Sequence, residues 1–442
     1  MNSLVSNQDL LNLLRCEVVP AIGCTEPIAV ALCVARAKEL LGAEPDKIEV
    51  YLSKNVYKNA LAVGIPNTGM TGLPIAIALG ATVGKSEYML EVLRDATPDA
   101  VAYAKEYMLR VPAQIHINYD APSILYIHAE VRKGDQTAQA TIIDQHTNFV
   151  THTPSTIHPT PSPIHHTPSL KESSPLKGEL EGVQLNLRRV YDFAMEVNTN
   201  DITFLREGAE MNTAAAETSF ADQYGHGLGR LLRANTLTAT PEMEKLFGNT
   251  LFTKIISYTC GACDARMSGA MVQVMSNSGS GNQGISCSIP VYLYAKENNC
   301  SEESTLRALA LSNLTVIYIK QSLGRLSALC GCVVAATGSA AGITFLMGGN
   351  YEEITYAIKN MIANISGMIC DGAKPGCALK VTSGVATAIF SAYLAMQHSF
   401  ADSTEGIVED DIDRTIRNLT RIGHDGMQVT DDLILDIMTH KQ

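Results

Sequence analysis

The chain has 442 residues, of which 46% are hydrophobic and 18% charged, and its formal net charge is −12 at pH 7. This length exceeds the roughly 250–300 residues at which a single core stops growing, so we expect two domains. An acidic chain without a run of lysine or arginine is a poor partner for nucleic acid and for an anionic membrane surface, and we expect neither.

The eleven cysteines follow no spacing typical of a small secreted disulfide framework. Asp9, Arg15 and Glu17 interrupt the apolar residues of the first segment, so we expect no secretory signal sequence there. We therefore expect a cytoplasmic protein with free thiols. Residues 326–351 carry no charge and are long enough to span a bilayer, but their many Gly, Ala, Ser and Thr residues favour a buried, closely packed helix.

Residues 7–19 place apolar side chains at helical spacing, with Asn7 as the expected N-cap, and a second apolar helix is expected over 28–41. Three residues that can take part in proton transfer lie just before that second helix: Cys24, Thr25 and Glu26. The free N–H groups and the dipole of a helix start favour an anion and lower the pKa of a thiol. Cys24 is therefore a candidate base or nucleophile; in the alternative, it is a small residue packed under the helix start.

Four segments read as strands: 47–53, 114–119, 124–132 and 136–144. They predict a small antiparallel sheet with helices on one side. A Gly-rich turn over 64–74, an Ala/Gly helix up to about residue 83 and a helix over 91–108 are expected between the first two strands. Three residues of the turn could present amides and a hydroxyl to a carboxylate, or could simply form the turn: Asn67, Thr68 and Gly69.

Residues 151–182 change to a low-complexity run of Thr, His, Pro and Ser, which predicts a flexible insertion between an N-terminal α+β domain (1–150) and a helical domain (183–442). Its histidines have no fixed geometry, so we expect no metal site there. Beyond it, helices are expected over 190–197, 202–218, 228–237 and 241–259, and a structural helical segment over 406–438. The predicted fold class is α+β, mainly helical, with a small, mostly antiparallel sheet in the N-terminal part.

Residues 275–284 form a run of small polar residues that can pack little but offers closely spaced amides, hydroxyls and carboxamides. Such a loop could bind the carboxylate and amine of a substrate, or be a plain linker. Its candidate binding residues are Ser276, Asn277, Ser278, Gly279, Ser280, Gly281 and Asn282. Cys260 and Cys263 have C-x-x-C spacing, but neither a βαβ context nor a second pair supports a redox or zinc role.

Cys370 and Cys377 lie seven positions apart across a turn rich in Gly and Pro, and Cys330 lies forty positions upstream of Cys370. Three thiolates from two segments could hold an iron–sulfur cluster and leave one iron open as a Lewis acid, which would make this a catalytic site. In the alternative, these cysteines are buried free thiols that pack as small hydrophobic residues.

Five motifs, over residues 23–27, 67–70, 275–284, 326–330 and 366–377, resemble in their order those of the L-cysteine desulfidase family, within the iron–sulfur L-serine dehydratase alpha-chain superfamily. The resemblance covers essentially the whole chain except the insertion. It implies a 4Fe–4S cluster held by Cys330, Cys370 and Cys377, with Cys24 as the base and no pyridoxal phosphate. In an alternative assignment Cys24 is itself a cluster ligand. Cys332 is a less secure candidate ligand.

The resemblance implies a β-elimination that converts L-cysteine to pyruvate, ammonia and hydrogen sulfide. Cys24 would remove the α-proton, while Glu26, the turn at 67–69 and the loop at 276–282 would orient the amino acid. L-serine dehydratase is the close alternative, a non-catalytic iron–sulfur redox sensor is a second, and a membrane transporter is a third. The expected partner is a small amino acid, and a homo-oligomer stays open.

Overall fold

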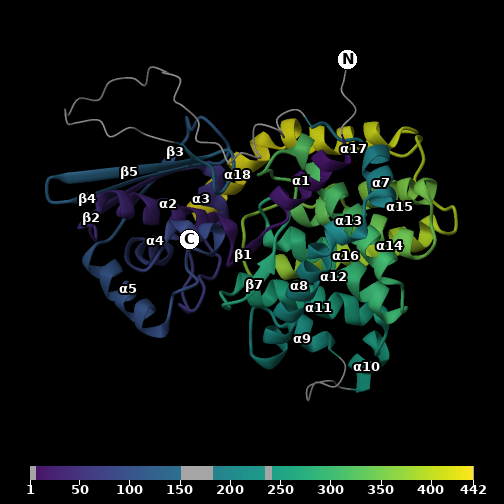
Figure 1. Ribbon diagram of the computed structural model, residues 1–442, viewed down its shortest axis with the longest axis horizontal. Coiled ribbons are helices and arrows are strands. Elements are labelled where there is room, and N and C mark those ends of the chain that lie inside the picture. Colours follow the sequence, from purple (N-terminus) through teal and green to yellow (C-terminus); the bar gives the residue numbers. More distant parts are fainter. Residues whose placement is uncertain (1–5, 151–182, 234–240, 442) are drawn as a thin grey trace.

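The computed structural model describes residues 6–150, 183–233 and 241–441. Two parts lie side by side: a smaller one with the sheet, purple to blue, and a larger helical one, teal to yellow (Figure 1). The predicted fold class, α+β and mainly helical, is confirmed. The predicted insertion at 151–182 lies outside the described residues.

The five strands of the smaller part form one sheet in the order β3-β2-β4-β5-β6. Their bounds are β2 (Lys47–Ser53), β3 (Gln114–Asn118), β4 (Tyr126–Lys133), β5 (Gln136–Ile143) and β6 (Phe149–Val150). All neighbouring strands are antiparallel except β2 and β3, which run parallel. A parallel pair needs a long crossover, which here is the helical segment between residues 54 and 110. The predicted mostly antiparallel sheet is thus confirmed.

Helix α2 (Thr25–Leu41) packs against β4 and β5 of the sheet. It begins three residues earlier than predicted because Pro27 falls in its first turn, where a missing N–H costs nothing. The crossover contains α3 (Lys54–Ala60), α4 (Leu73–Thr82), the 3₁₀ helix η1 (Ser86–Glu91) and α5 (Pro98–Arg110). The predicted helix start at residue 91 is wrong, since Thr97 caps a helix that begins at Pro98.

The first helix, α1 (Asn7–Glu17), belongs to the core of the helical part, where Leu10 and Leu14 are fully buried. Its N-cap is Ser6, one residue before the predicted cap, because Ser6 and Asp9 form a capping box. The chain then forms β1 (Pro20–Ile22), which pairs with β7 (Gln273–Met275), and crosses to the sheet part at α2. Residue 24 therefore lies at the junction of the two parts, and the predicted domain boundary at residue 150 stays a prediction.

The helical part packs around α14. Its elements are α7 (Leu187–Glu196), η2 (Thr199–Ile202), α8 (Phe204–Ala221), α9 (Leu228–Leu232), α10 (Pro241–Phe247), α11 (Leu251–Met267), α12 (Gly281–Glu297), α13 (Glu302–Leu323), α14 (Gly331–Leu346), α15 (Tyr351–Ile365), α16 (Cys377–Ala395) and α17 (Ile412–Arg421). The predicted helix over 241–259 is two helices, separated at Gly248 by a positive φ.

Helix α14 is buried along almost its whole length between α12, α13, α15 and α16, so the predicted buried helix in the charge-free segment is confirmed. A Cβ at Gly338 would lie 2.5 Å from the carbonyl oxygen of Ser312, which shows how closely its small residues let α13 approach. Among the described helices, only α16 is long and apolar enough to cross a membrane, and 44% of that stretch is buried inside the protein.

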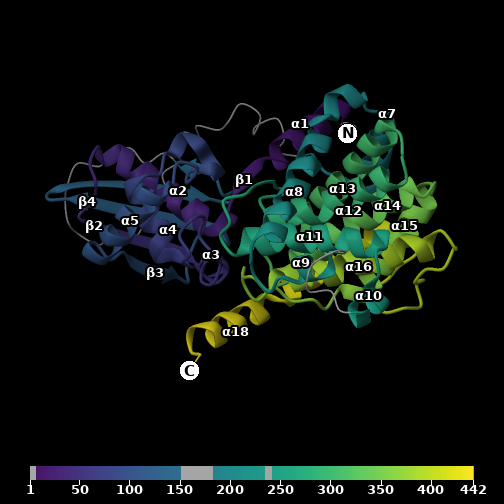
Figure 2. The same ribbon diagram turned by 90° about the horizontal axis from the view of Figure 1, so that it is seen from below.

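After α17 the chain makes one turn of π-helix (Ile422–Gly426) and ends in α18 (Gln428–Thr439). Helix α18 leaves the helical part and lies beside α3 of the smaller part (Figures 1 and 2). Both ends of the chain thus cross between the two parts.

Candidate active site

Four helices begin at the junction of the two parts: α2, α12, α14 and α16. Cys24 is the N-cap of α2, Cys330 is the N-cap of α14, and Cys377 is the first residue of α16. The starts of α12 and α14 touch, since a Cβ at Gly331 would lie 3.3 Å from the side chain of Gln283. Helix starts favour negative charge, so this junction suits thiolates and an anionic ligand.

A short backbone pairing brings Cys330 and Cys370 together. Leu329 and Ile369 form an antiparallel bridge, the amide of Cys330 donates to the carbonyl of Met368 at 2.9 Å, and that of Cys370 donates to the carbonyl of Ala328 at 2.7 Å. Two cysteines forty positions apart in the sequence thereby become neighbours.

The turn after Cys370 then returns the chain to Cys377. Gly372 makes this turn with a φ of +87°, and the thiol of Cys377 lies 3.8 Å from its carbonyl oxygen. All three predicted cluster cysteines therefore come from adjoining segments at one place.

The charges around these thiols suit a negatively charged group. The thiol of Cys332 donates to Cys330 and lowers the pKa of Cys330 to about 7, although burial opposes this shift. Burial and, after it, the neighbouring Cys370 raise the pKa of Cys377 to about 11. Three lysine ammonium groups lower the pKa of one or more of these thiols: Lys58, Lys374 and Lys380.

Among the described residues, no three His, Cys, Asp or Glu side chains are arranged to hold a single metal ion. The thiolates of an iron–sulfur cluster each bind a different iron and so need a wider spacing than ligands of one ion. Three thiols from adjoining segments, two of them at helix starts and all near lysine ammonium groups, fit such a cluster in the type of donor and in charge.

Cys24, Thr25 and Glu26 form a buried group. The thiol of Cys24 and the hydroxyl of Thr25 both donate to Oε2 of Glu26 at 3.1 Å. The amide of Asn59, on α3, donates to Oε1 of the same carboxylate at 3.2 Å. Glu26 therefore accepts three hydrogen bonds, one of them from the candidate base.

The predicted lowering of the pKa of Cys24 by the helix start is wrong. Burial and the carboxylate of Glu26 raise the pKa of Cys24 well above its ordinary value, although Arg266 opposes this. Burial also raises the pKa of Glu26, but His146, the Cys24 thiol and Arg266 together outweigh it and leave that pKa below its usual value. At neutral pH the group is thus a thiol beside a carboxylate.

The sequence reasoning missed Arg266, at the end of α11. It is 1% exposed, and its Nη1 donates to Oδ1 of Asn282 at 2.9 Å. Its Nε and Nη2 have no hydrogen-bond partner within the described chain, and a Cβ at Gly281 would lie 2.4 Å from Nε. Two unpaired guanidinium donors at the start of α12 have the geometry and the charge that suit a carboxylate.

Three further buried atoms near this group are unpaired in the part of the chain that the structure describes: Oδ1 of Asn59, Oε1 of Gln283 and Nε2 of His146. The first two are acceptors and complement the donors of Arg266. Burial lowers the pKa of His146 to about 4, although Glu26 opposes this, so the ring is neutral and its free nitrogen can accept a proton.

The predicted substrate loop divides into two halves. The first half binds the protein itself: Ser276 donates to the carbonyl of Val19, Asn277 to Asn313, and Ser278 to Asn277. Its second half, from 279 to 282, faces His146 and Arg266. Ser280 is the N-cap of α12 and makes no side-chain cap bond.

The predicted turn at 67–69 is occupied by local contacts. The hydroxyl of Thr68 donates to the carbonyl of Ile65 at 2.7 Å, and the amide of Asn67 donates to the carbonyl of Ala96 at 3.2 Å. Asn67 and Gly69 are exposed, and the turn packs against Gly269, just after α11. Substrate binding by this turn stays a prediction.

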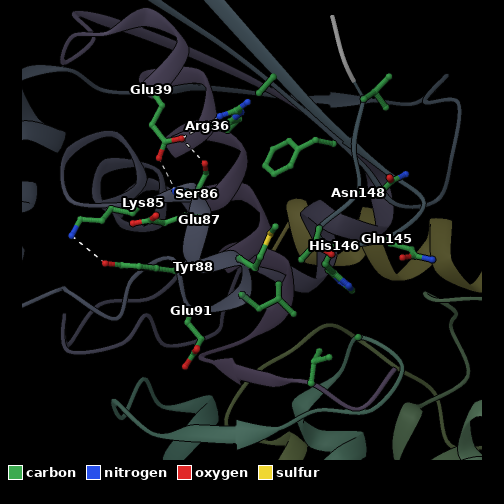
Figure 3. A pocket seen from close by; sticks show the side chains of 18 of the residues that line it. Arg36, Glu39, Lys85, Ser86, Glu87, Tyr88, Glu91, Gln145, His146 and Asn148 are labelled. Carbon is green, nitrogen blue, oxygen red and sulfur yellow. Dashed lines mark hydrogen bonds and ion pairs between the residues drawn. The ribbon is translucent and has the colours of Figure 1, made fainter. Parts of the chain in front are cut away.

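A pocket of about 1050 Å³ adjoins the buried group (Figure 3). His146 points into it, opposite the helix that carries Glu39, whose carboxylate binds Ser86. Gly279 and the ion pair between Arg325 and Glu17 also line it, and a Cβ at Gly279 would lie 2.8 Å from Nδ1 of His146. The pocket and the buried group thus share His146, which lines the pocket and acts on the pKa of Glu26.

The C-x-x-C pair lies inside α11, where Cys260 and Cys263 are both fully buried. Burial and, after it, Cys377 raise the pKa of Cys263 well above the ordinary value, and Cys263 in turn raises the pKa of Cys332. This pair therefore lies against the cluster cysteines rather than forming a separate site.

Comparison with known proteins identifies the family of the chain. The family model described as "Serine dehydratase alpha chain" matches residues 87–436. A UPF0597 protein of Phocaeicola vulgatus is 55% identical over 435 residues, and one of Bacteroides fragilis is 54% identical over 434 residues, with 98% of each chain covered in both cases. One of Photobacterium profundum is 42% identical over 433 residues, again 98% of each chain.

Proposed function

Because the chain belongs to the serine dehydratase alpha chain family, a family of lyase-type enzymes, we propose that it is an iron–sulfur-dependent L-cysteine desulfidase. It would convert L-cysteine to pyruvate, ammonia and hydrogen sulfide. The observation that carries this proposal is the set of adjoining thiols Cys330, Cys370 and Cys377 at the same junction as the Cys24–Glu26 pair.

Cys330, Cys370 and Cys377 would hold a 4Fe–4S cluster, which when bound supplies a Lewis acid for the carboxylate and the leaving group of the substrate. The unpaired Nε and Nη2 of Arg266 bind the same carboxylate from the side of α12. The unpaired oxygens of Asn59 and Gln283 accept hydrogen bonds from the ammonium group. Together these atoms match both charges of an amino acid.

Cys24 and Glu26 remove the α-proton as a pair. The sulfur of Cys24 takes the proton from the α-carbon while its own proton passes along the 3.1 Å hydrogen bond to the ionised Glu26. The electron pair of the broken C–H bond forms the Cα–Cβ double bond, and sulfide leaves from the β-carbon. The aminoacrylate tautomerises and is hydrolysed to pyruvate and ammonia.

Two observations bear on whether the substrate is L-cysteine or L-serine. Before the reaction both His146 and Glu26 are unprotonated at pH 7, so the one proton within reach of the leaving group is the proton that Glu26 receives from Cys24; sulfide, the better leaving group, depends on it less than hydroxide does. The family description, in turn, favours L-serine dehydratase as the second candidate function. Both reactions use the same residues and differ in the group that leaves.

The substrate must reach a buried site, since Cys24, Glu26 and Arg266 are all buried. We infer that it enters through the pocket of Figure 3, whose lining includes His146, Gly279 and Arg325. The Arg325–Glu17 pair carries one charge of each sign at that position, which suits a passing amino acid.

The test is to purify the protein without oxygen, to reconstitute iron and sulfide, and to measure sulfide and pyruvate from L-cysteine and L-serine in parallel. We expect equal amounts of sulfide and pyruvate, lost in Cys24→Ala and in Cys370→Ala, with cluster absorbance lost only in Cys370→Ala. Cys300→Ala, at a partly exposed cysteine after α12, is the matched control.

Each other result has a distinct meaning. Loss of the cluster in Cys24→Ala would make Cys24 a ligand. Faster pyruvate release from serine would make the protein a dehydratase. A stable cluster without turnover of either amino acid would overturn the lyase proposal and favour a redox sensor.

A further inference from the structure

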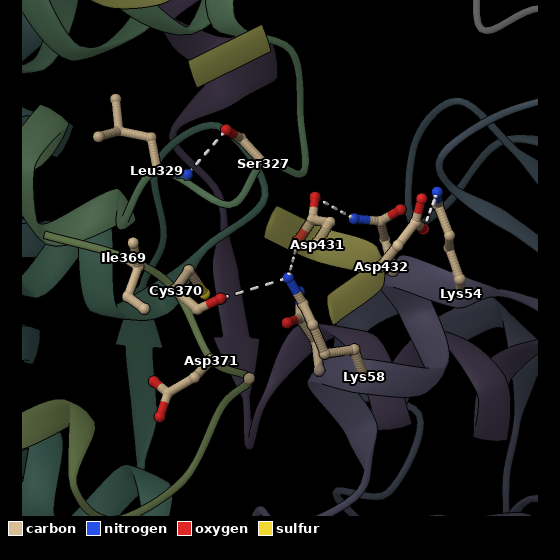
Figure 4. A network of polar contacts seen from close by, with 12 residues as sticks. Lys54, Lys58, Ser327, Leu329, Ile369, Cys370, Asp371, Asp431 and Asp432 are labelled. Atoms are coloured by element: carbon tan, nitrogen blue, oxygen red, sulfur yellow. Dashed lines mark hydrogen bonds and ion pairs between the residues drawn. The ribbon is translucent and has the colours of Figure 1, made fainter. Parts of the chain in front are cut away.

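A buried ion pair fastens the C-terminal helix to the smaller part of the protein (Figure 4). Lys58, on α3, is 2% exposed, and its ammonium group binds Oδ1 of Asp431 on α18. The other oxygen of Asp431 accepts a hydrogen bond from the amide of Asn55 at 2.9 Å. A second pair, Lys54 with Asp432, lies outside and is more exposed.

The same ammonium group also contacts the cluster segment. Nζ of Lys58 donates to the carbonyl of Cys370 at 3.3 Å (Figure 4). The turn that follows lies between α3 and α18, because a Cβ at Gly372 would be 2.6 Å from the carbonyl oxygen of Lys58 and 3.2 Å from the methyl group of Met438. The segment from Cys370 to Gly372 thus contacts α3 through Lys58 and α18 through Met438.

The segment that leads into Cys330 also contacts the residues before α18. The hydroxyl of Ser327 donates to the carbonyl of Gly423 at 2.9 Å and accepts from the amide of Leu329 at 3.0 Å. A Cβ at Gly423 would lie 3.0 Å from Cβ of Leu329, the residue before Cys330. Residues 422–439 therefore touch both strands that carry cluster cysteines.

Helix α18 docks through a small buried face. Its buried residues are Asp431, Ile434 and Leu435, whereas Val429, Leu433 and Ile437 are 77%, 58% and 54% exposed. Asp431 is the charged member of that face. A buried ion pair has a defined geometry, and removing one of its charges leaves the other charge buried without a partner.

We propose that residues 422–439 form a C-terminal clasp that positions Cys370 and Cys330 for the cluster, with Lys58–Asp431 as the fastening contact. Lys58 and Asp431 are positioning residues, since Lys58 touches the carbonyl of Cys370 and Asp431 acts through Lys58. The role in cluster retention rests on the proposed function, whereas the positioning of the two thiols does not.

The test uses full-length protein in two forms. In the anaerobically reconstituted form, the rate of iron loss to a ferrous chelator is measured for Lys58→Met and Asp431→Asn. We expect iron loss to be roughly tenfold faster in both, because each leaves a buried group unpaired. The double variant Lys58→Met/Asp431→Leu removes both polar groups and is expected to recover most of the retention. Asp432→Asn, in the exposed pair, is the control and should stay within about twofold.

In the apo form, alkylation of Cys370 and Cys330 by iodoacetamide is followed by mass spectrometry, with far-UV circular dichroism to confirm folding. The single variants should alkylate roughly tenfold faster at Cys370 than the wild type, while Cys300 is unchanged. Unchanged alkylation in folded single variants would overturn the clasp, whatever the cluster does. A wild type that takes up no cluster would overturn the proposed function and the retention role, and the alkylation result would still decide the positioning.

Discussion

Lys58 and Asn59 are neighbours on α3, yet they bind different halves of the proposed site: Lys58 donates to the carbonyl of Cys370 and Asn59 to the carboxylate of Glu26. One turn of α3 thus contacts both Cys370, a proposed cluster ligand, and Glu26, of the proposed Cys24–Glu26 pair. Substitutions at the two positions should separate cluster retention from proton transfer.

Asn59→Ala should lower kcat roughly tenfold or more and leave the cluster absorbance unchanged, because a hydrogen bond to an ionised group is lost while Cys370 keeps its contacts. The missing donor also raises the pKa of Glu26, so the acid side of the kcat/KM profile should move to higher pH. The profile is measured from pH 4 to 8 together with iron content. Asn298→Ala, at the exposed end of α12, is the control, and loss of iron in Asn59→Ala would contradict the assignment.

Arg266→Lys should raise KM for the amino acid by roughly 10- to 100-fold with a smaller effect on kcat, because one point charge replaces two parallel guanidinium donors. Steady-state kinetics of the reconstituted enzyme measure this split. Arg206→Lys, in a partly exposed ion pair of α8, is the matched control. An unchanged KM would remove Arg266 from the carboxylate site.

His146 should make the apo protein less stable in acid. Its pKa is about 4 in the fold and 6.5 in an ordinary setting, so between these values the unfolded chain binds a proton that the folded chain does not. The free energy of unfolding should therefore fall as pH is lowered through this window, by about 3 kcal/mol in total. Urea unfolding of reduced protein at pH 6.5, 5 and 4 follows this fall, of which about half is expected between pH 6.5 and 5.

His146→Gln cannot be protonated and should show a flatter dependence on pH over the same window. His116→Gln, at an exposed histidine of β3, should keep the wild-type slope. Equal slopes in the wild type and in His146→Gln would show that His146 is accessible to protons in the fold.

Lys320 should set an alkaline limit on activity. Burial and, after it, Arg325 lower the pKa of Lys320 to about 8, so this positive charge near Glu26 and Cys370 is lost as pH rises through 8. We expect kcat/KM to fall above about pH 8. In Lys320→Arg the fall should move to higher pH, since a guanidinium keeps its proton. Lys359→Arg, at a buried lysine of α15, is the control, and an unmoved limit in Lys320→Arg would exclude Lys320 as its cause.

Local patterns were enough to predict the sheet. Alternating residues such as Val50 and Leu52 place every second side chain in the core, and this period is visible without any partner strand. The parallel pairing of β2 with β3 was not visible in this way, because it depends on where the crossover returns the chain. The break at Gly248 was missed for a similar reason, since one glycine in an apolar run is compatible with a helix.

The site residues proposed from the sequence lie in compact motifs, as Cys24, Cys370 and Cys377 do. Arg266, His146 and Asn59 come from separate segments, and only tertiary packing brings them to Glu26. For Arg266 a signal existed, namely a basic residue in the last turn of a helix whose C-terminal half is otherwise almost uncharged. The direction of the pKa shift of Cys24 depends on burial, which no local pattern reports.

The pairing of β1 with β7 and the contact of Lys58 with Asp431 have a consequence for biosynthesis. A ribosome that adds roughly 5–20 residues per second completes Asp431 about 20–80 s after Cys24, and until then the junction lacks one of its parts. On the proposed function, iron and sulfide would be inserted after α18 has been synthesised. A stop codon that removes only α18 would then loosen the segment of Cys370 as the loss of the Lys58–Asp431 contact does, rather than trim an idle tail.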